Sequence, residues 1–232
     1  MKYKLLYILT LLLFAACRNI DAPQPMVNGL SFLPTANGHI TVYKQTIVNI
    51  DVAAGIYDTT EILLREIMRG QIGEASDALL HRVEVQRFNA AELRWLPHNT
   101  YELQLSALRI ARVDTNTVIV ILHFPQVENK SWQGNVLNTN PAERFKYTAV
   151  NMDTIIQSQH YDSVSEVTQR NFETMYSLQR QKELYRQGIG LLRREVYNVE
   201  SQHLPGKPLD LSKPLLDRLT KGKIEITEIL NQ

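Results

Sequence analysis

Residues 108–124, Leu-Arg-Ile-Ala-Arg-Val-Asp-Thr-Asn-Thr-Val-Ile-Val-Ile-Leu-His-Phe, decide the fold class of this chain. Two apolar runs rich in β-branched residues flank the polar stretch Asp114–Thr117. Turn-forming residues between two such runs are typical of a β-hairpin. The second run, Val118–Phe124, is apolar on both faces, which predicts a central strand covered on either side.

The same pattern recurs along most of the chain. Val83 and Val85 alternate with charged or polar neighbours, and Tyr101, Leu103 and Leu105 repeat this period of two. Alternation of this kind indicates strands that are buried on one face. Further strands are expected at residues 40–50, 145–150, 164–168, 189–197 and 223–230. The chain is therefore predicted to be mainly β.

Two segments do not follow this pattern. Asp58 is suited to cap a helix, and residues 59–68 contain helix formers followed by Gly70, so local propensity predicts a helix there. Residues 171–186 carry long polar side chains that suit either a helix or a solvent-exposed strand. The choice between helix and strand stays open for residues 171–186.

The N-terminus has the order of a lipoprotein signal peptide. Two lysines precede an apolar run over residues 5–14, within the roughly 7–15 residues of a signal peptide core and short of the ~20 of a spanning helix. Leu13-Phe14-Ala15-Ala16-Cys17 resembles the bacterial lipobox, in which the cysteine receives a diacylglyceryl group. Residues 1–16 are then removed, residues 17–29 form a flexible tether, and one β-rich domain extends over residues 30–232.

The lipidated state of Cys17 also has a physical argument. Cys17 is the only cysteine in the sequence, so it has no partner for a disulfide in the oxidising environment of an exported protein. A free thiol is the alternative, but two acyl chains give stable membrane anchoring, which is expected here with palmitate labelling as its sign. Arg18 after the cysteine and the absence of an acidic cluster favour the outer membrane, facing the periplasm.

The charge balance excludes one class of partner. The sequence has 25 Lys and Arg against 24 Asp and Glu, a formal net charge of +1. A nucleic-acid-binding domain would carry a strong basic excess. No nucleic acid partner is therefore expected.

Several short motifs resemble a family of uncharacterised lipoproteins of the Bacteroidota, which open with a Phe-Pro…Gly…Tyr pattern and close with Tyr-x-x-Gly-Val-Gly-Leu. In this chain the motifs are Phe32-Leu33-Pro34 with Gly38 and Tyr43, Phe124-Pro125 with Ser131–Asn135, and Tyr185-Arg-Gln-Gly188-Ile-Gly190-Leu191 followed by Arg194-Glu195. The chain departs from the family at Thr41, where a tryptophan is usual, and at Asn129, where a glycine is usual. Asparagine tolerates the left-handed conformation of such a turn.

The resemblance implies a single domain built on an antiparallel sheet, curved or half-barrel in form, with one or two short helices. It implies a strand at residues 59–68, against their local propensity, since tertiary context often overrides propensity. It implies no chemical activity, because the family has no assigned one.

The closing motif also has a physical interpretation. Gly188 and Gly190 are predicted to form a structural turn with positive φ before the chain enters the sheet. A phosphate-binding loop would need a further glycine or a Lys-Ser/Thr pair opening a helix, and the residues that follow supply neither.

Catalytic constellations have no anchor in the sequence. The six histidines lack the spacing of a metal site, and no serine lies in a Gly-x-Ser-x-Gly motif. Four carboxylates in amphipathic stretches are expected on the solvent-exposed faces of strands: Glu183, Glu195, Glu225 and Glu228. The chain is therefore predicted to be no enzyme, with no catalytic residue, no metal site and no cofactor.

Two aromatic residues are candidates for a ligand or interaction site. Trp132 follows the apolar run that ends at Phe124, where it would either line a cleft or cover the end of the core, and core cover is the stronger expectation. Tyr185 opens the closing motif. Trp95 is expected on an exposed hairpin tip.

Two functions remain open. The first is a non-enzymatic envelope interaction or scaffold protein that docks on an envelope complex through an exposed strand edge or a face of the sheet. The alternative is a periplasmic binding protein or carrier that holds a lipid or other hydrophobic ligand in a β-sheet cleft. A large apolar cavity beside Trp132 would favour the carrier, and a filled core with an unpaired edge would favour docking.

Overall fold

The computed structural model describes residues 27–75, 77–204, 206 and 209–230. The predicted signal peptide, Cys17 and most of the predicted tether lie outside these residues. Val27, the first described residue, already packs against the core, and Gly29 is buried. Among the described residues, no helix combines the length and the apolar character needed to cross a membrane.

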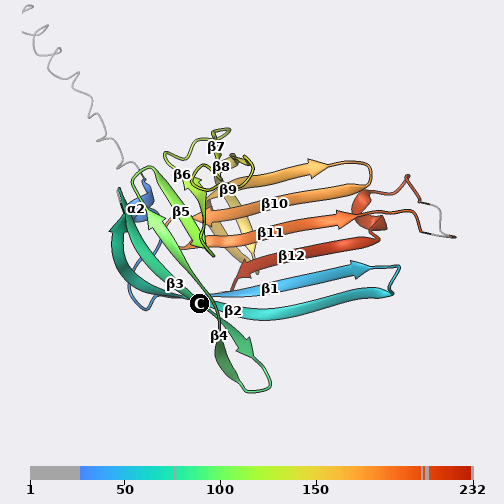
Figure 1. Cartoon of the computed structure of the whole chain (residues 1–232), viewed down its shortest axis with the longest axis horizontal. Helices are drawn as coiled ribbons and strands as arrows, with labels where there is room; N and C mark the ends of the chain where they lie inside the picture. Colours follow the sequence, from blue (N-terminus) through green and yellow to red (C-terminus); the bar gives the residue numbers. More distant parts are fainter. Residues whose placement is uncertain (1–26, 76, 205, 207–208, 231–232) are drawn as a thin grey trace, which may run out of the picture.

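Twelve strands form a single antiparallel sheet, as the alternating pattern and the resemblance led us to expect (Figure 1). The strands are β1 (Ile40–Asp51), β2 (Ile56–Ala75), β3 (Ala78–Asn89), β4 (Arg94–Leu105), β5 (Arg109–Asp114), β6 (Thr117–His123), β7 (Ser131–Gln133), β8 (Arg144–Ile156), β9 (Gln159–Glu173), β10 (Ser177–Arg186), β11 (Gly190–Glu200) and β12 (Lys221–Ile229). Their order in the sheet is β6-β5-β4-β3-β2-β1-β12-β11-β10-β9-β8-β7. Every pairing except β1–β12 therefore joins strands that are neighbours in sequence, and the β1–β12 pair joins the two halves of the sheet.

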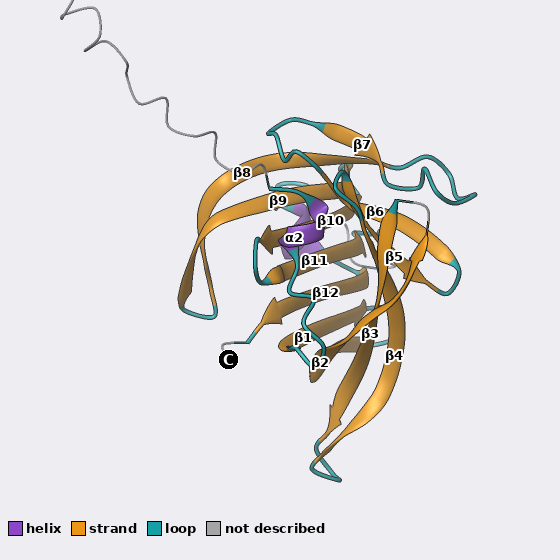
Figure 2. Cartoon of the chain, turned by 90° about the vertical axis from the view of Figure 1, so that its left-hand side faces the viewer, coloured by secondary structure: helices purple, strands orange, loops and turns teal. Residues whose placement is uncertain are grey.

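The sheet curls until its two ends, β6 and β7, almost meet. The backbone N–H of Val120 on β6 donates to the carbonyl oxygen of Gly134, just after β7, over 2.9 Å. The indole Nε1 of Trp132 donates to the carbonyl oxygen of Val120 over 2.8 Å. These two bonds bridge the seam and give the sheet a nearly closed, barrel-like form (Figure 2).

A short helix, α2 (Gly29–Phe32), lies inside one end of the curled sheet (Figure 2). Asn28 caps it by accepting a hydrogen bond from the N–H of Leu30 at 3.0 Å. A Cβ atom at Gly29 would lie 2.3 Å from the carbonyl oxygen of Ser106, so only glycine fits this approach. Phe32 is 2% exposed and packs on Phe124 with ring centroids 5.3 Å apart. The helix thus anchors the start of the domain in the core.

The apolar core changes sides along the sheet. At the α2 end it fills the inside of the curl, where Leu105, Ile110 and Leu122 are fully buried. At the other end, alternation along β10 and β11 places Leu178 and Val199 on the opposite, outer face. There they pack with Leu215 of the short 3-10 helix η1 (Leu215–Arg218). The inner face is left free for polar side chains where the outer face carries the core.

The segments with ambiguous propensity are strands. Residues 59–68 lie within β2, which confirms the strand implied by the resemblance and shows that the helix favoured by local propensity is wrong. Their register with β1 alternates inner positions such as Leu64 and Glu66 with outer ones such as Arg65. Residues 171–186 form the end of β9 and all of β10. Pairing with neighbouring strands outweighs a preference of a few tenths of a kcal/mol per residue.

One strand prediction is wrong in its position. β6 was expected at the centre of the sheet because it is apolar on both faces, but it lies at the end of the strand order. The closure explains the pattern: Trp132 and the segment after β7 cover β6, with Asn138 Nδ2 donating to the carbonyl oxygen of Val118 at 2.6 Å. A strand at the seam of a curled sheet is therefore as covered as a central one.

Candidate functional site

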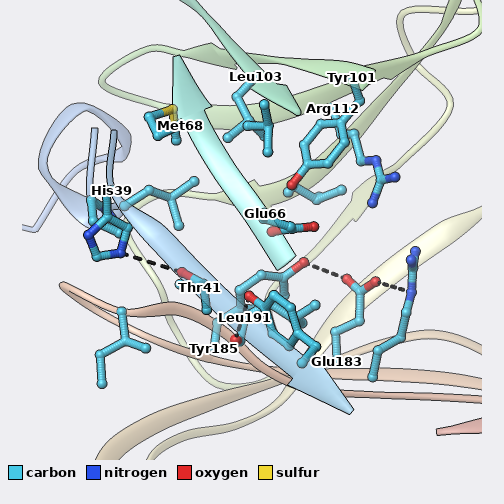
Figure 3. A pocket seen from close by; sticks show the side chains of 18 residues that line it. His39, Thr41, Glu66, Met68, Tyr101, Leu103, Arg112, Glu183, Tyr185 and Leu191 are labelled. Carbon is cyan, nitrogen blue, oxygen red and sulfur yellow. Dashed lines mark hydrogen bonds and ion pairs between the residues drawn. The ribbon is translucent and has the colours of Figure 1, made fainter. Parts of the chain in front are cut away.

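A cavity of about 80 Å³ opens on the inner face of the sheet, between the β1–β2 part of the wall and the β10–β11 part. This is several times the ~10–15 Å³ that one water molecule needs. Figure 3 shows its side chains converging from β2, β4, β5 and β10. The ionisable and hydroxyl-bearing residues that line it are His39, Thr41, Tyr43, Glu66, Tyr101, Arg112, Glu183, Tyr185 and Arg194.

Glu183 is the most enclosed charged group of the cavity, with 2% of its surface exposed. Its Oε1 lies 2.8 Å from Nε of Arg194 on the neighbouring strand β11. Its Oε2 accepts hydrogen bonds from the Tyr185 hydroxyl at 2.6 Å and from Gln169 Nε2 at 2.5 Å. Both carboxylate oxygens are therefore engaged, as a buried charge requires.

Local strand geometry explains how these partners meet. Glu183 and Tyr185 are two residues apart on β10 and so point to the same face. Arg194 is the register partner of Glu183 across the β10–β11 pair. Gln169 is skipped in the β9–β10 register, at a β-bulge, and its side chain turns inward to Glu183.

Glu66 lies on β2 close to Tyr101 (Figure 3). The Tyr101 hydroxyl donates a hydrogen bond to it. Within the described residues no Lys, Arg or His nitrogen forms an ion pair with Glu66. Arg112 is close enough to act on its charge, but its guanidinium stacks on the Tyr101 ring at 4.0 Å and pairs with Asp114 at 3.1 Å. Burial raises the pKa of Glu66, and Arg112 and the Tyr101 hydrogen bond offset part of this.

Three tyrosines surround the two carboxylates. Burial raises the pKa of Tyr43, Tyr101 and Tyr185 well above the usual value, and the nearby carboxylates add to the effect. The three hydroxyls therefore stay protonated and donate hydrogen bonds. Tyr43 donates to the carbonyl oxygen of Leu191 at 3.2 Å. The pKa of the Arg194 guanidinium is raised, chiefly by Glu183.

The loop after α2 and the turn before β11 line the cavity near the molecular surface. Leu33, His39 and Ile189 are half-buried, and His39 Nε2 lies 3.4 Å from the Thr41 hydroxyl. The Gly188 N–H donates to the carbonyl oxygen of Phe32 at 2.9 Å, which ties this loop to this turn. We place the opening of the cavity between them.

The structure brings some of the predicted residues to this site. Tyr185 lines the cavity and binds Glu183. Gly188 and Gly190 have φ of 78° and 96° and form the turn beside the opening, as predicted from the closing motif. Asn129 has the left-handed conformation expected of it, with φ of 67°.

Trp132 lies elsewhere. Its side chain is 9% exposed and packs against Phe145 and Tyr147, with a ring-centroid distance of 4.8 Å to Tyr147. It covers the core at the seam and lines no part of the cavity. Of its two predicted roles, the structure matches the core cover. Cys17, predicted to carry the lipid, lies outside the described residues.

The prediction for Glu183 is wrong: it was expected on a solvent-exposed strand face and is buried. Glu195, Glu225 and Glu228 are half-buried and belong to surface ion pairs or hydrogen bonds. Four further residues of the site were not predicted from the sequence as site residues: Glu66, Tyr101, Arg112 and Arg194. The available signal was the alternation itself, because Glu183 shares a face with Tyr185 and Tyr101 shares one with Leu103 and Leu105.

The arrangement is suited to holding a small polar molecule. Protonated tyrosine hydroxyls, two carboxylates and two guanidinium groups point into one space with a restricted opening. In the part of the chain that the structure describes, no three His, Cys, Asp or Glu residues group closely enough to hold a metal ion. Comparison with protein-family models and with curated proteins finds no match for this chain.

Proposed function

We propose that this protein is a lipid-anchored envelope protein that binds a small polar ligand inside its barrel-like sheet. The observation that carries the proposal is the cavity lined by Glu66, Glu183, Arg112 and Arg194. Charged groups buried inside a curled sheet lower the stability of the fold unless they are paired or serve a function such as ligand binding. A convergent set of polar groups in a pocket is the usual form of a ligand site.

The size and lining of the cavity favour a small polar ligand over a lipid. Drug-sized ligands occupy pockets of ~300–1,000 Å³, which is several times the volume of about 80 Å³ found here. An acyl chain would also have to displace the hydration of Glu66 and the Arg194 guanidinium without replacing it. The region around Trp132, where a carrier cavity was envisaged, is filled by Phe145 and Tyr147.

The location and the non-enzymatic character form part of the proposal. The lipobox-like sequence ending at Cys17 supports anchoring through an acyl group, with the domain in the periplasm beneath the outer membrane. Glu183 has both carboxylate oxygens engaged by neighbours, an arrangement that favours holding a ligand over transferring a proton.

Native mass spectrometry tests the proposed function. The full-length protein is purified from cell membranes in mild detergent and compared with the same protein after denaturation and refolding. We expect an additional mass of a small molecule that is lost on refolding. The variant Leu103→Trp fills the cavity and should lack this mass, whereas Leu93→Trp, at an exposed position, should keep it. An identical additional mass in Leu103→Trp, provided that the variant folds, or no small molecule in any sample would contradict the proposal.

A second candidate function, docking on another envelope protein, is supported by an unpaired stretch of β2. Residues 56–63 pair with β1 on one side, but the described register with β3 begins only at Leu64. The β3–β4 hairpin swings away from β2 here (Figure 1), and a groove of about 860 Å³ lies between them. Its lining includes Phe88 and Leu63, and Tyr57 on the free stretch is 72% exposed.

The occupant proposed for this groove is an extended segment of a partner protein that adds a strand to β2. A photo-crosslinker at Thr59 in intact cells should give a discrete adduct that maps to one extended peptide of the partner. A crosslinker at Phe172, which is exposed on a different strand, serves as the control. Equal labelling from both positions would contradict docking at this edge.

A further inference from the structure

The charges that line the inner cavity are not fully matched by one another. Glu183 is neutralised by Arg194 and Arg112 is paired with Asp114. Glu66 receives the hydrogen bond of Tyr101 but has no ion-pair partner among the described residues. One carboxylate therefore faces the cavity without a direct ion-pair partner among the described residues.

The environment of Glu66 is suited to an ammonium group. A carboxylate next to tyrosine side chains is the usual setting in which proteins bind ammonium ligands, because the aromatic faces attract cations. Tyr101 and Tyr185 lie on the cavity wall with Glu66 (Figure 3), and Tyr43 lines the same cavity. The ring of Tyr101 already carries one cation, Arg112, on one face. An ammonium donor would supply the direct ion pair that Glu66 lacks.

Arg194 has N–H donors that lack a hydrogen-bond acceptor. A guanidinium has five N–H donors. Arg194 Nε lies 2.8 Å from Glu183 Oε1 as an ion pair without forming a hydrogen bond, and no hydrogen bond of its two terminal nitrogens is found within the described residues. About a third of the Arg194 side chain, 33%, is exposed, and it lines the same cavity as Glu66. A carboxylate would accept bidentate hydrogen bonds from these nitrogens.

We propose that the cavity binds a zwitterion of amino-acid size, with its ammonium group against Glu66 and its carboxylate against Arg194. This inference rests on the proposed function and names its ligand class. A single small molecule that carries both groups satisfies both demands without adding net charge to a buried site. A simple cation would meet the repulsion of Arg112 and Arg194, and a simple anion that of Glu66 and Glu183. The volume limits the molecule to a short side chain.

Three related molecules separate the two charges: alanine has both, the smaller ethylamine has only the ammonium group, and propionate has only the carboxylate. Binding of each is measured by calorimetry on the full-length protein in detergent, after refolding to remove any bound molecule. We expect alanine to bind at least about tenfold more tightly than ethylamine or propionate. Glycine and serine serve as zwitterions with a smaller and a more polar side chain.

Two variants assign the two ends of the ligand. Glu66→Gln keeps the shape and should abolish the preference for alanine over propionate, while propionate, relieved of the repulsion of Glu66, should bind at least as tightly as before. Arg194→Lys keeps the charge beside Glu183 but loses the planar pair of donors, so it should reduce the preference for alanine over ethylamine. Thermal unfolding checks that both variants fold.

The outcomes distinguish this inference from the proposed function. Equal binding of the three molecules, or zwitterions that all bind more weakly than about 10 mM, overturns the zwitterion assignment. If mass spectrometry then still shows a cavity-dependent small molecule, only the ligand class is wrong. If it shows none, the proposed function fails as well.

Discussion

The indole Nε1 of Trp132 lies 2.8 Å from the carbonyl oxygen of Val120, and this hydrogen bond joins the two ends of the sheet. Trp132→Phe keeps an aromatic ring but removes the donor and leaves a buried carbonyl with one partner fewer. We expect the free energy of unfolding, measured in urea, to fall by about 1–3 kcal/mol. Trp95→Phe is the matched control, since Trp95 is half-exposed near the β3–β4 hairpin tip and its loss should cost about 0.5 kcal/mol. Equal costs would show that the seam does not depend on this bond.

Tyr147 stabilises the neighbouring segment through its hydroxyl. It donates to the carbonyl oxygen of His123 at 3.0 Å and accepts from the N–H of His123 at 3.2 Å. Tyr147→Phe should lower the free energy of unfolding at neutral pH by about 1–3 kcal/mol, because the buried N–H of His123 loses this acceptor.

The cost of Tyr147→Phe should depend on pH. Burial raises the pKa of Tyr147 to about 12, whereas in the unfolded chain the phenol titrates near its usual value of 10. The contribution of the Tyr147 hydroxyl to the free energy of unfolding is present in full below the pKa of the unfolded chain. It is lost as pH rises through the pKa of the folded state. The difference in the free energy of unfolding between wild type and Tyr147→Phe should therefore narrow between pH 10 and about 12. A gap that widens over this range would contradict the assignment.

Glu66→Gln tests whether the Glu66 carboxylate destabilises the protein when no ligand is bound. Burial raises the pKa of Glu66, so the folded state favours the neutral acid. Protonated Glu66 therefore adds to the stability of the fold at pH values below the pKa of the unfolded chain. This added stability is lost as pH rises through the raised pKa of the folded state. Glutamine stays neutral, so the melting temperature of Glu66→Gln should exceed that of wild type increasingly as pH rises from acidic to neutral. A variant whose melting temperature falls below that of wild type as pH rises to neutral would indicate a stabilising ion pair at Glu66 instead.

The turn before β11 depends on the left-handed backbone of Gly188. Its φ is 78°, and no atom lies within 4 Å of a Cβ built there, so any cost of substitution comes from the backbone alone. Gly188→Val should lower the free energy of unfolding by about 1–2 kcal/mol. Gln187→Val, at the exposed neighbouring position, introduces the same side chain as a control. An unchanged melting temperature for Gly188→Val would remove the argument for this turn.

Alternating polarity predicted most of the fold because each strand has one covered face. The predicted central position of β6 was wrong. This strand is apolar on both faces because the segment across the seam covers it, and it lies at one end of the strand order. Local propensity also failed at residues 59–68, where pairing with β1, joined by β3 from Leu64 onward, determines the structure. These are long-range effects that a single-sequence pattern does not contain.

The site was harder to predict than the fold. Tyr185 and the two glycines were found through one contiguous motif. Glu66, Arg112 and Arg194 come from three strands that are far apart in sequence, and their approach depends on the curl of the whole sheet. Glu183 resembles any glutamate on an amphipathic strand until its face is known to turn inward.

NMR of the tyrosine rings tests the central claim most directly. The low-molecular-weight fraction of cells that produce the protein is added to refolded protein with labelled tyrosines. We predict that the ring signals of Tyr43, Tyr101 and Tyr185 shift, while that of Tyr197, on the outer face beneath Arg180, does not. Unchanged signals from all three cavity tyrosines, or shifts confined to tyrosines outside the cavity, would contradict a ligand site inside the sheet.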